Sequence, residues 1–142
     1  MVRFAAQAFA RLKPDAAVFE SVLGEYLTAP KSEVWFEADM QAPAELRRAC
    51  DRGGLRLDRR SRMLYTAQVV FINGETVPEA MCGSALLRTL ADRRTLDAQQ
   101  FKAATPPERA LLVDWCAQGW LTPLRDSAPD AQGTKGKHDG DA

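Results

Sequence analysis

A stripe of apolar residues between positions 15 and 28 is the clearest periodic pattern along the chain. The spacing i, i+1, i+4, i+5, i+8 and i+9 is typical of one face of a helix. Asp15 is a good N-cap for this helix, and Pro30 ends it. The stripe is wider than a lone helix ahead of a small domain can readily bury, which predicts a homodimer interface, with folding back onto its own chain as the alternative. Its members are Val18, Phe19, Val22, Leu23, Tyr26 and Leu27.

The middle of the chain changes from helical spacing to short segments typical of strands. Pro43 begins a predicted helix, and Gly53-Gly54 end it. Residues 55–57, 63–65 and 69–72 are then predicted to be three short strands. Asn73-Gly74 is the strongest two-residue hairpin signal, because both positions tolerate positive φ, so residues 75–77 are predicted to form the return strand.

Helical patterns return after Pro78. Predicted helices cover residues 80–91, 97–104 and 108–118, and a capping box starts the last of them at Thr105. Gly119 ends this helix, and Trp120 enters a final short strand. The residues expected to face inward are Met81, Ala85, Leu86, Leu90, Leu96, Phe101, Leu111, Leu112, Trp115 and Cys116.

The order of these elements predicts an α+β chain. Residues 1–52 are expected to form a helical arm used for dimerisation, beginning with a short helix at residues 4–12. Residues 53–124 are expected to form a small winged-helix-like domain. Residues 125–142 contain no large apolar side chain and are expected to form a disordered tail.

Composition excludes several classes of function. The 142 residues carry 19 basic and 19 acidic side chains, so no overall charge attracts the chain to nucleic acid or to a membrane surface. No apolar run approaches the roughly 20 residues that span a bilayer. The three cysteines are widely spaced and form no CxxC pair, which favours reduced thiols in a cytoplasmic protein.

Little in the chain points to catalysis. The one histidine, His138, lies in the polar tail, and neither a glycine-rich phosphate loop nor a Ser/His/Asp set is present. Cys116 lies beside Trp115 on a predicted inner face and has no histidine to serve as its base, which favours a buried, inert thiol. The sequence therefore predicts no catalytic, cofactor-binding or metal-binding residue.

Seven arginines form the strongest charge asymmetry. They can be interpreted as a patch that contacts phosphates of ribosomal RNA or DNA, or as a solvated face balanced by Glu45, Asp51 and Asp58, and the second interpretation is favoured. The helix at residues 108–118 is nearly neutral outside its core face, which argues against DNA recognition. The arginines are Arg47, Arg48, Arg52, Arg56, Arg59, Arg60 and Arg62.

The three tryptophans allow two interpretations. They can serve as stacking platforms for bases or as packing residues. Packing is favoured for Trp115 and Trp120, which flank the last predicted helix. Trp35 lies in the extended, acidic segment EVWFE and is a candidate for packing across a subunit boundary.

Four segments together resemble the C-terminal part of one family. They are GEYLTAPK at residues 24–31, RLDRRSRMLY at 56–65, FINGE at 71–75 and WCAQGWLTP at 115–123. The family is the bacterial cupin, or JmjC-type, oxygenases that hydroxylate an arginine of a ribosomal protein. The resemblance implies a homodimerising helical segment followed by a winged helix, both placed after a catalytic domain that uses Fe(II) and 2-oxoglutarate.

The chain departs from that family in its chemistry. Such oxygenases hold iron with a His-x-Asp/Glu pair and a distant second histidine, and neither occurs here. The resemblance therefore implies a non-catalytic dimerisation and winged-helix module that is not an enzyme on its own, with a second copy and a ribosomal protein or the ribosome as expected partners. A truncated gene, a split gene or a misplaced start would each give such a chain.

Two alternatives stay open. The first is an oxygenase by family membership, which acts by complementing a separate catalytic chain. The second is a small winged-helix protein that binds nucleic acid.

Overall fold

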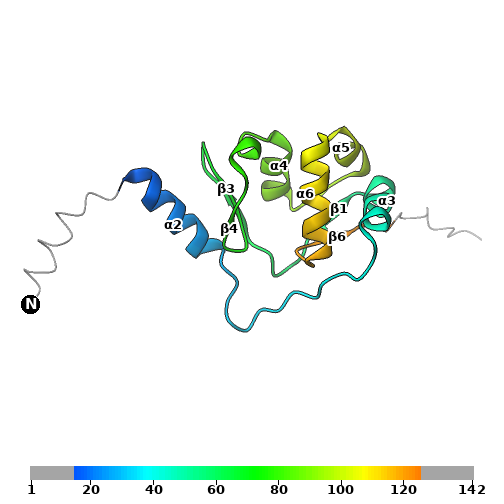
Figure 1. Cartoon of the computed structure of the whole chain (residues 1–142), viewed down its shortest axis with the longest axis horizontal. Helices are drawn as coiled ribbons and strands as arrows, with labels where there is room; N and C mark the ends of the chain where they lie inside the picture. Colours follow the sequence, from blue (N-terminus) through cyan, green and yellow to red (C-terminus); the bar gives the residue numbers. More distant parts are fainter. Residues whose placement is uncertain (1–14, 126–142) are drawn as a thin grey trace, which may run out of the picture.

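The computed structural model describes residues 15–125, so the helix predicted at residues 4–12 and the tail predicted beyond Arg125 lie outside the described part. Helix α2 (Ala16–Thr28) lies at one end of the molecule, and α3 (Pro43–Gly53) lies at the other, although they are neighbours in the sequence (Figure 1). An irregular segment, residues 29–42, connects them along the body of the domain.

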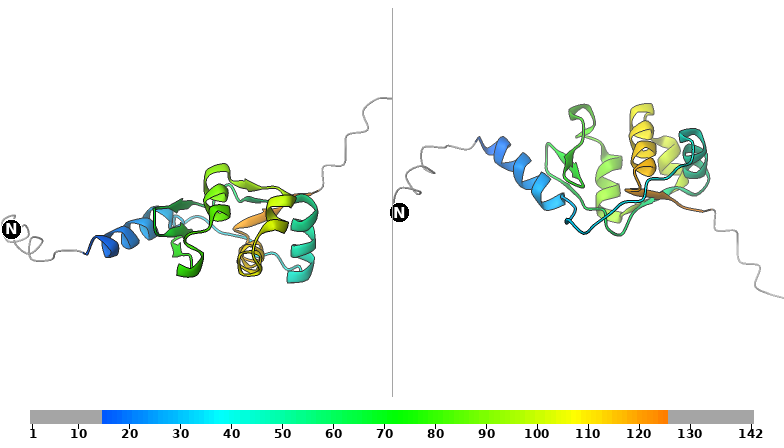
Figure 2. Two further views of the ribbon diagram at one scale, coloured as in Figure 1. Left: turned by 90° about the horizontal axis from the view of Figure 1, so that it is seen from above. Right: turned by 60° about the horizontal axis from the view of Figure 1, so that its bottom comes forward.

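Helix α2 begins where the sequence predicts. The Asp15 carboxylate accepts a hydrogen bond from the amide of Ala17, so it satisfies one of the free amides at the helix start. Only Gly24 and Thr28 of this helix are buried, and the helix contacts the strands β2 (Met63–Tyr65), β3 (Val70–Ile72) and β4 (Glu75–Thr76). The helix extends away from the body of the molecule in both further views (Figure 2).

The strands form two small antiparallel sheets. One has the order β5–β1–β6, formed by β5 (Thr95–Leu96), β1 (Leu55–Leu57) and β6 (Leu121–Pro123). Along β1, Leu55 and Leu57 are buried and Arg56 is exposed, so one face of this sheet packs on the core and the other faces water. The sequence did not predict β5.

The second sheet forms the wing, with the order β2–β3–β4. It comprises β2 (Met63–Tyr65), β3 (Val70–Ile72) and β4 (Glu75–Thr76). The turn between β3 and β4 is the predicted one: Asn73 has φ 49° and Gly74 has φ 86°. Strands β1 and β2 are consecutive in the chain but do not form a hairpin. Both edges of β1 are already paired, one with β5 and the other with β6.

The helix predicted at residues 80–91 is wrong in its extent, and its predicted inner face is confirmed in part. A 3₁₀ turn, η1 (Glu79–Met81), is separated from α4 (Ala85–Arg93), which begins at the N-cap Ser84. Leu87 and Leu90 are buried, whereas Ala85 is exposed and Leu86 only half-buried. Leu90 is therefore buried as predicted, and Met81 and Leu86 pack against the core as partly buried side chains, whereas the burial of Leu87 was not predicted.

The last two helices both begin with a capping box, of which the one at Thr105 was predicted. Helix α5 (Ala98–Ala103) has a capping box between Asp97 and Gln100, and α6 (Pro106–Ala117) has one between Thr105 and Glu108. Leu96 and Phe101 are fully buried, as expected. On α6 the buried residues are Leu112, Val113, Trp115 and Cys116, while Leu111 is half-buried.

One hydrophobic core lies between the helices and the β5–β1–β6 sheet and extends to Met63, Val70 and Ile72 of the wing. Helix α3, which the sequence analysis assigned to the helical arm, packs here against α5 and α6. Its Leu46 and Cys50 are completely buried. Within the described residues, α2 is therefore the helix that stands outside this core.

Candidate interaction surfaces

The apolar stripe of α2 is exposed along its whole length. Every one of the six predicted interface residues is accessible, from 42% for Leu23 to 77% for Tyr26. The helix is seated on the wing by its opposite face, where small and polar residues lie. The alternative in which the stripe folds back onto its own domain is therefore not what the structure shows.

Gly24 and Thr28 are the two buried residues of α2, and they attach the helix to the wing. A Cβ atom at Gly24 would overlap the ring of Phe71, so only glycine lets this strand approach the helix. The Thr28 hydroxyl donates to the carbonyl oxygen of Gly24 at 2.8 Å and accepts from the amide of Gly74 at 3.0 Å. Nearby, the Thr76 hydroxyl donates to Glu25 at 3.0 Å.

A shallow depression continues the stripe beyond the end of α2. It has a volume of about 320 Å³ and is lined by Tyr26, Leu27, Ala29, Pro30, Lys31 and Arg62. Apolar rings and aliphatic side chains therefore extend from the helix to the loop that follows it, with two cations at the border.

The seven predicted arginines do not form one continuous patch. Arg47 and Arg48 line a cavity between α3 and α6, together with Arg109, which the sequence analysis did not include. Arg56, Arg59 and Arg60 line a second depression on β1 and the turn after it. Arg52 lines a third depression, and Arg62 borders the one beside α2.

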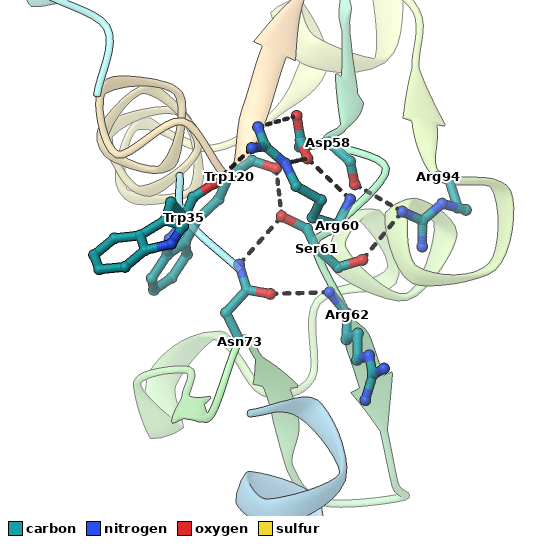
Figure 3. A network of polar contacts seen from close by, with 8 residues as sticks. All are labelled: Trp35, Asp58, Arg60, Ser61, Arg62, Asn73, Arg94 and Trp120. Carbon is teal, nitrogen blue, oxygen red and sulfur yellow. Dashed lines mark hydrogen bonds and ion pairs between the residues drawn. The ribbon is translucent and has the colours of Figure 1, made fainter. Parts of the chain in front are cut away.

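A polar network joins the two sheets and the connecting segment (Figure 3). The buried Ser61 hydroxyl donates to the carbonyl oxygen of Trp120 at 2.8 Å and accepts from the Asn73 amide at 3.1 Å. Arg94 donates to the carbonyl oxygens of Asp58 and Ser61. The network comprises Trp35, Asp58, Arg60, Ser61, Arg62, Asn73, Arg94 and Trp120.

The Arg60 side chain makes three contacts within the protein. Its guanidinium pairs with the Asp58 carboxylate at 2.8 Å, donates to the backbone oxygen of Trp35 and lies 5.5 Å from the ring centre of Phe36. The hydrogen bond from Arg60 lowers the pKa of the Asp58 carboxyl, despite the opposing effect of partial burial. Arg60 therefore attaches Trp35 and Phe36 of the connecting segment to the turn after β1.

Two of the three tryptophans, Trp115 and Trp120, are packing residues, as the sequence predicts. Trp115 and Trp120 are buried, with ring centres 6.4 Å apart. The rings of Phe36 and Trp120 pack in an edge-to-face arrangement, with their centres 6.4 Å apart. Trp35 is 78% exposed, although its backbone oxygen is bound by Arg60, so its ring is available for a contact with another molecule.

The cysteines lie inside the fold. Cys50 of α3 and Cys116 of α6 place their Sγ atoms 4.0 Å apart, and both thiols are buried. Contact with Cys50 and burial raise the pKa of the Cys116 thiol, which disfavours a thiolate nucleophile there. Sixty-six residues separate these cysteines along the chain, so the sequence did not indicate their contact.

The described residues hold no cluster of three or more His, Cys, Asp or Glu side chains placed to bind a metal ion. Within residues 15–125, no helix is long and apolar enough to cross a bilayer. On α6, the carboxylates of Glu108 and Asp114 are engaged by Thr105 and Gln118 respectively.

Comparison with known proteins gives the family. A family model described as the ROXA-like winged helix matches residues 11–122. The chain belongs to the ROXA-like winged-helix family. This match confirms the resemblance found in the sequence and the predicted α+β, winged-helix fold.

Solved structures share the fold of the ROXA-like chain. The X-ray structure of E. coli ycfD has a TM-score of 0.65 and 21% identity, covering 84% of this chain and 33% of that one. The structure of YcfD, a ribosomal oxygenase from Escherichia coli, in complex with cobalt and 2-oxoglutarate has a TM-score of 0.64 and 20% identity, covering 84% and 34% respectively. The ROXA-like chain thus spans about a third of these structures. A search of curated proteins gave no match.

Proposed function

We propose that this chain is a homodimerising winged-helix module of the ribosomal-oxygenase type and has no oxygenase activity of its own. The observation that carries the proposal is the exposed stripe of α2. Six large apolar side chains stay in contact with water on a helix whose opposite face is already seated on the wing.

The physical case for association rests on the area that the stripe would remove from water. Large apolar side chains each contribute about 1.5–3 kcal/mol when fully buried, so half-burying six of them is worth on the order of 5 kcal/mol per protomer. A contiguous exposed apolar surface of this kind marks an interaction site. The stripe is therefore expected to be covered in the functional state.

A second copy of the chain is the occupant we propose. An isologous dimer needs a surface that complements itself, and an apolar stripe on a straight helix meets this requirement because two copies can pack antiparallel. The depression beside Tyr26 and Pro30 would receive the end of the partner helix. The exposed ring of Trp35 is available to extend the contact.

The catalytic part of the family's function would reside outside these residues. E. coli YcfD is described as a ribosomal oxygenase and has been seen with cobalt and 2-oxoglutarate. The present chain does not fit such a metal, because it has one histidine and lacks a His-x-Asp/Glu pair. We propose that the module supplies dimerisation and a contact with a ribosomal protein or the ribosome.

Mass measurement by light scattering tests the dimer. The wild type is expected to have twice the chain mass at tens of micromolar, and the double variant Phe19→Glu, Tyr26→Glu is expected to be a folded monomer. Both side chains are more than half exposed, so charge there should not disturb the fold. Circular dichroism verifies that the variant is folded.

The control variant is Met40→Glu. Met40 is 94% exposed but lies in the connecting segment, away from the stripe, so this variant should remain a dimer. A monomeric wild type would contradict the proposal. Unfolding of the double variant would show instead that the stripe belongs to an intramolecular core.

A further inference from the structure

The cavity between α3 and α6 is the largest of the depressions described above, with a volume of about 650 Å³. Both helices begin beside it, since Pro43 and Pro106 line it. Ala44, Ala110 and Val113 provide further apolar lining. The cavity is open to solvent. The two helices that line it pack together, and α3 lies at the end of the molecule opposite α2 (Figures 1 and 2).

Three arginines surround this apolar surface. Arg47 and Arg48 come from α3, and Arg109 comes from the second turn of α6. Within residues 15–125, the ion pair between Arg60 and Asp58 is the only one, so these three guanidinium groups are unpaired there. The Nε of Arg109 is also buried and has no hydrogen-bond partner among the described residues.

The local charge is positive even though the chain is neutral. The single acidic residue in the lining is Asp51, so the three arginines leave a formal charge of +2 at the cavity. The N-terminal ends of α3 and α6 add the positive ends of two helix dipoles. An anion in the cavity would be attracted by the unpaired guanidinium groups and by both helix ends.

We propose that this cavity is the docking site for an acidic peptide segment of a partner protein. Its carboxylates would pair with Arg47, Arg48 and Arg109, since a guanidinium matches a carboxylate in a two-pronged geometry. A neighbouring aliphatic side chain of the segment would pack on Ala110 and Val113. The site is independent of the α2 dimer, because the two surfaces lie at opposite ends of the molecule.

A peptide fits this site better than a nucleic acid does. Single-stranded nucleic acid is held by aromatic side chains on which bases stack, and none of the described residues lining the cavity is aromatic. The remaining arginines of the sequence cluster line separate depressions and do not extend this one into a track.

Fluorescence anisotropy with the whole chain tests the proposal. The probe is a fluorescein-labelled peptide, Ala-Glu-Leu-Glu-Asp-Leu-Ala, measured near physiological ionic strength, where long-range attraction is screened. Saturable binding is expected, and the same peptide with Gln and Asn in place of its acidic residues should bind at least tenfold more weakly. Amide NMR signals of Ala44, Ala110 and Val113 should shift on titration.

A charge-matched pair of variants separates the cavity from general attraction. Arg47→Gln with Arg109→Gln should lower the affinity at least tenfold. Arg59→Gln with Arg93→Gln removes the same charge from exposed positions outside the cavity and should leave the affinity within twofold. Unchanged thermal midpoints verify the fold of both.

Three outcomes would overturn the proposal. One is the absence of saturable binding of the acidic peptide. Another is an equal loss of affinity in both double variants, which would indicate non-specific attraction. The third is tighter binding of a labelled ten-nucleotide oligouridine with the same dependence on Arg47 and Arg109, which would make the cavity a nucleic-acid site.

Discussion

At the scale of single residues, Gly24 and Asn73 determine how the wing is placed. Gly24 allows Phe71 to lie directly against α2. Asn73 is buried, accepts a hydrogen bond from the Arg62 amide at 2.9 Å and donates to Ser61. It also adopts a positive φ, which Asn tolerates better than most residues. Gly24 therefore sets the distance between α2 and β3. Asn73 forms the turn between β3 and β4 and joins it to Ser61 and Arg62.

Replacing Gly24 with alanine is expected to destabilise the protein. Alanine gains about 1 kcal/mol of helix propensity over glycine, whereas overpacking a filled site costs typically about 1–3 kcal/mol. The added methyl would overlap the ring of Phe71, so we expect overpacking to dominate and the free energy of unfolding to fall by about 1–2 kcal/mol. Urea denaturation at a fixed protein concentration measures the change.

Gly83→Ala is the matched control for this substitution. A Cβ atom at Gly83 meets nothing within 4 Å. Its φ is compatible with alanine, so this change should be neutral or stabilise the fold by up to about 1 kcal/mol. If Gly24→Ala were as stable as wild type, α2 would not be seated on Phe71.

At the scale of elements, Ser84 and Glu108 connect the starts of two helices. The Ser84 hydroxyl accepts from the amide of Leu87, which caps α4, and donates to the carboxylate of Glu108. That carboxylate also accepts from the amide and the hydroxyl of Thr105, both at 2.8 Å, which caps α6. One side chain therefore stabilises both helix N-termini.

Glu108 is expected to make stability depend on pH in the acidic range. Partial burial opposes its ionisation, but the hydrogen bonds from Ser84 and Thr105 outweigh this effect and lower the pKa of the carboxyl. A carboxyl with a lowered pKa stabilises the fold above its ordinary value of 4.5, and this contribution is lost as pH falls through the lowered pKa. Thermal midpoints across this range should show the loss.

Glu108→Gln should remove that contribution. The variant is expected to lose about 1 kcal/mol of stability at neutral pH, because one oxygen acceptor becomes a donor, and its midpoint should fall less steeply below pH 4.5 than that of wild type. Glu45→Gln is the control, since Glu45 also lies in the first turn of a helix but is exposed. A Glu108→Gln profile that parallels wild type would exclude this role.

At the scale of the whole molecule, the exposed stripe and the arginine-lined cavity lie at opposite ends. The stripe belongs to α2, and the cavity lies between α3 and α6 (Figure 1). The irregular segment between these ends is held to the domain by Arg60, through the oxygen of Trp35 and the ring of Phe36. Two contacts with different partners are thus sterically compatible.

The purified chain is expected to bind no Fe(II) at a defined site and to turn over no 2-oxoglutarate. The physical reason is the ligand set: the facial triad needs two histidines and a carboxylate, and the sequence has His138 as its one histidine. Metal analysis after dialysis against Fe(II), with succinate release as the activity assay, provides the measurement. Stoichiometric iron or succinate formation would refute this expectation.

The sequence by itself determined the features that depend on neighbouring residues. The caps at Asp15 and Thr105 and the turn at Asn73-Gly74 each involve groups within four residues of one another, so their chemistry can be inferred from the order of amino acids. The apolar stripe of α2 follows from helical spacing in the same way.

The tertiary structure alone decided what lies next to what. The two-residue strand Thr95–Leu96 exists because β1 pairs with it, and two residues carry too little local preference to signal a strand. Arg109 joins Arg47 and Arg48 because α3 and α6 pack together, although about sixty positions separate them along the chain. The exposure of the α2 stripe also depends on the tertiary structure. Helical periodicity identifies an apolar face, but it does not show whether another part of the chain packs on that face.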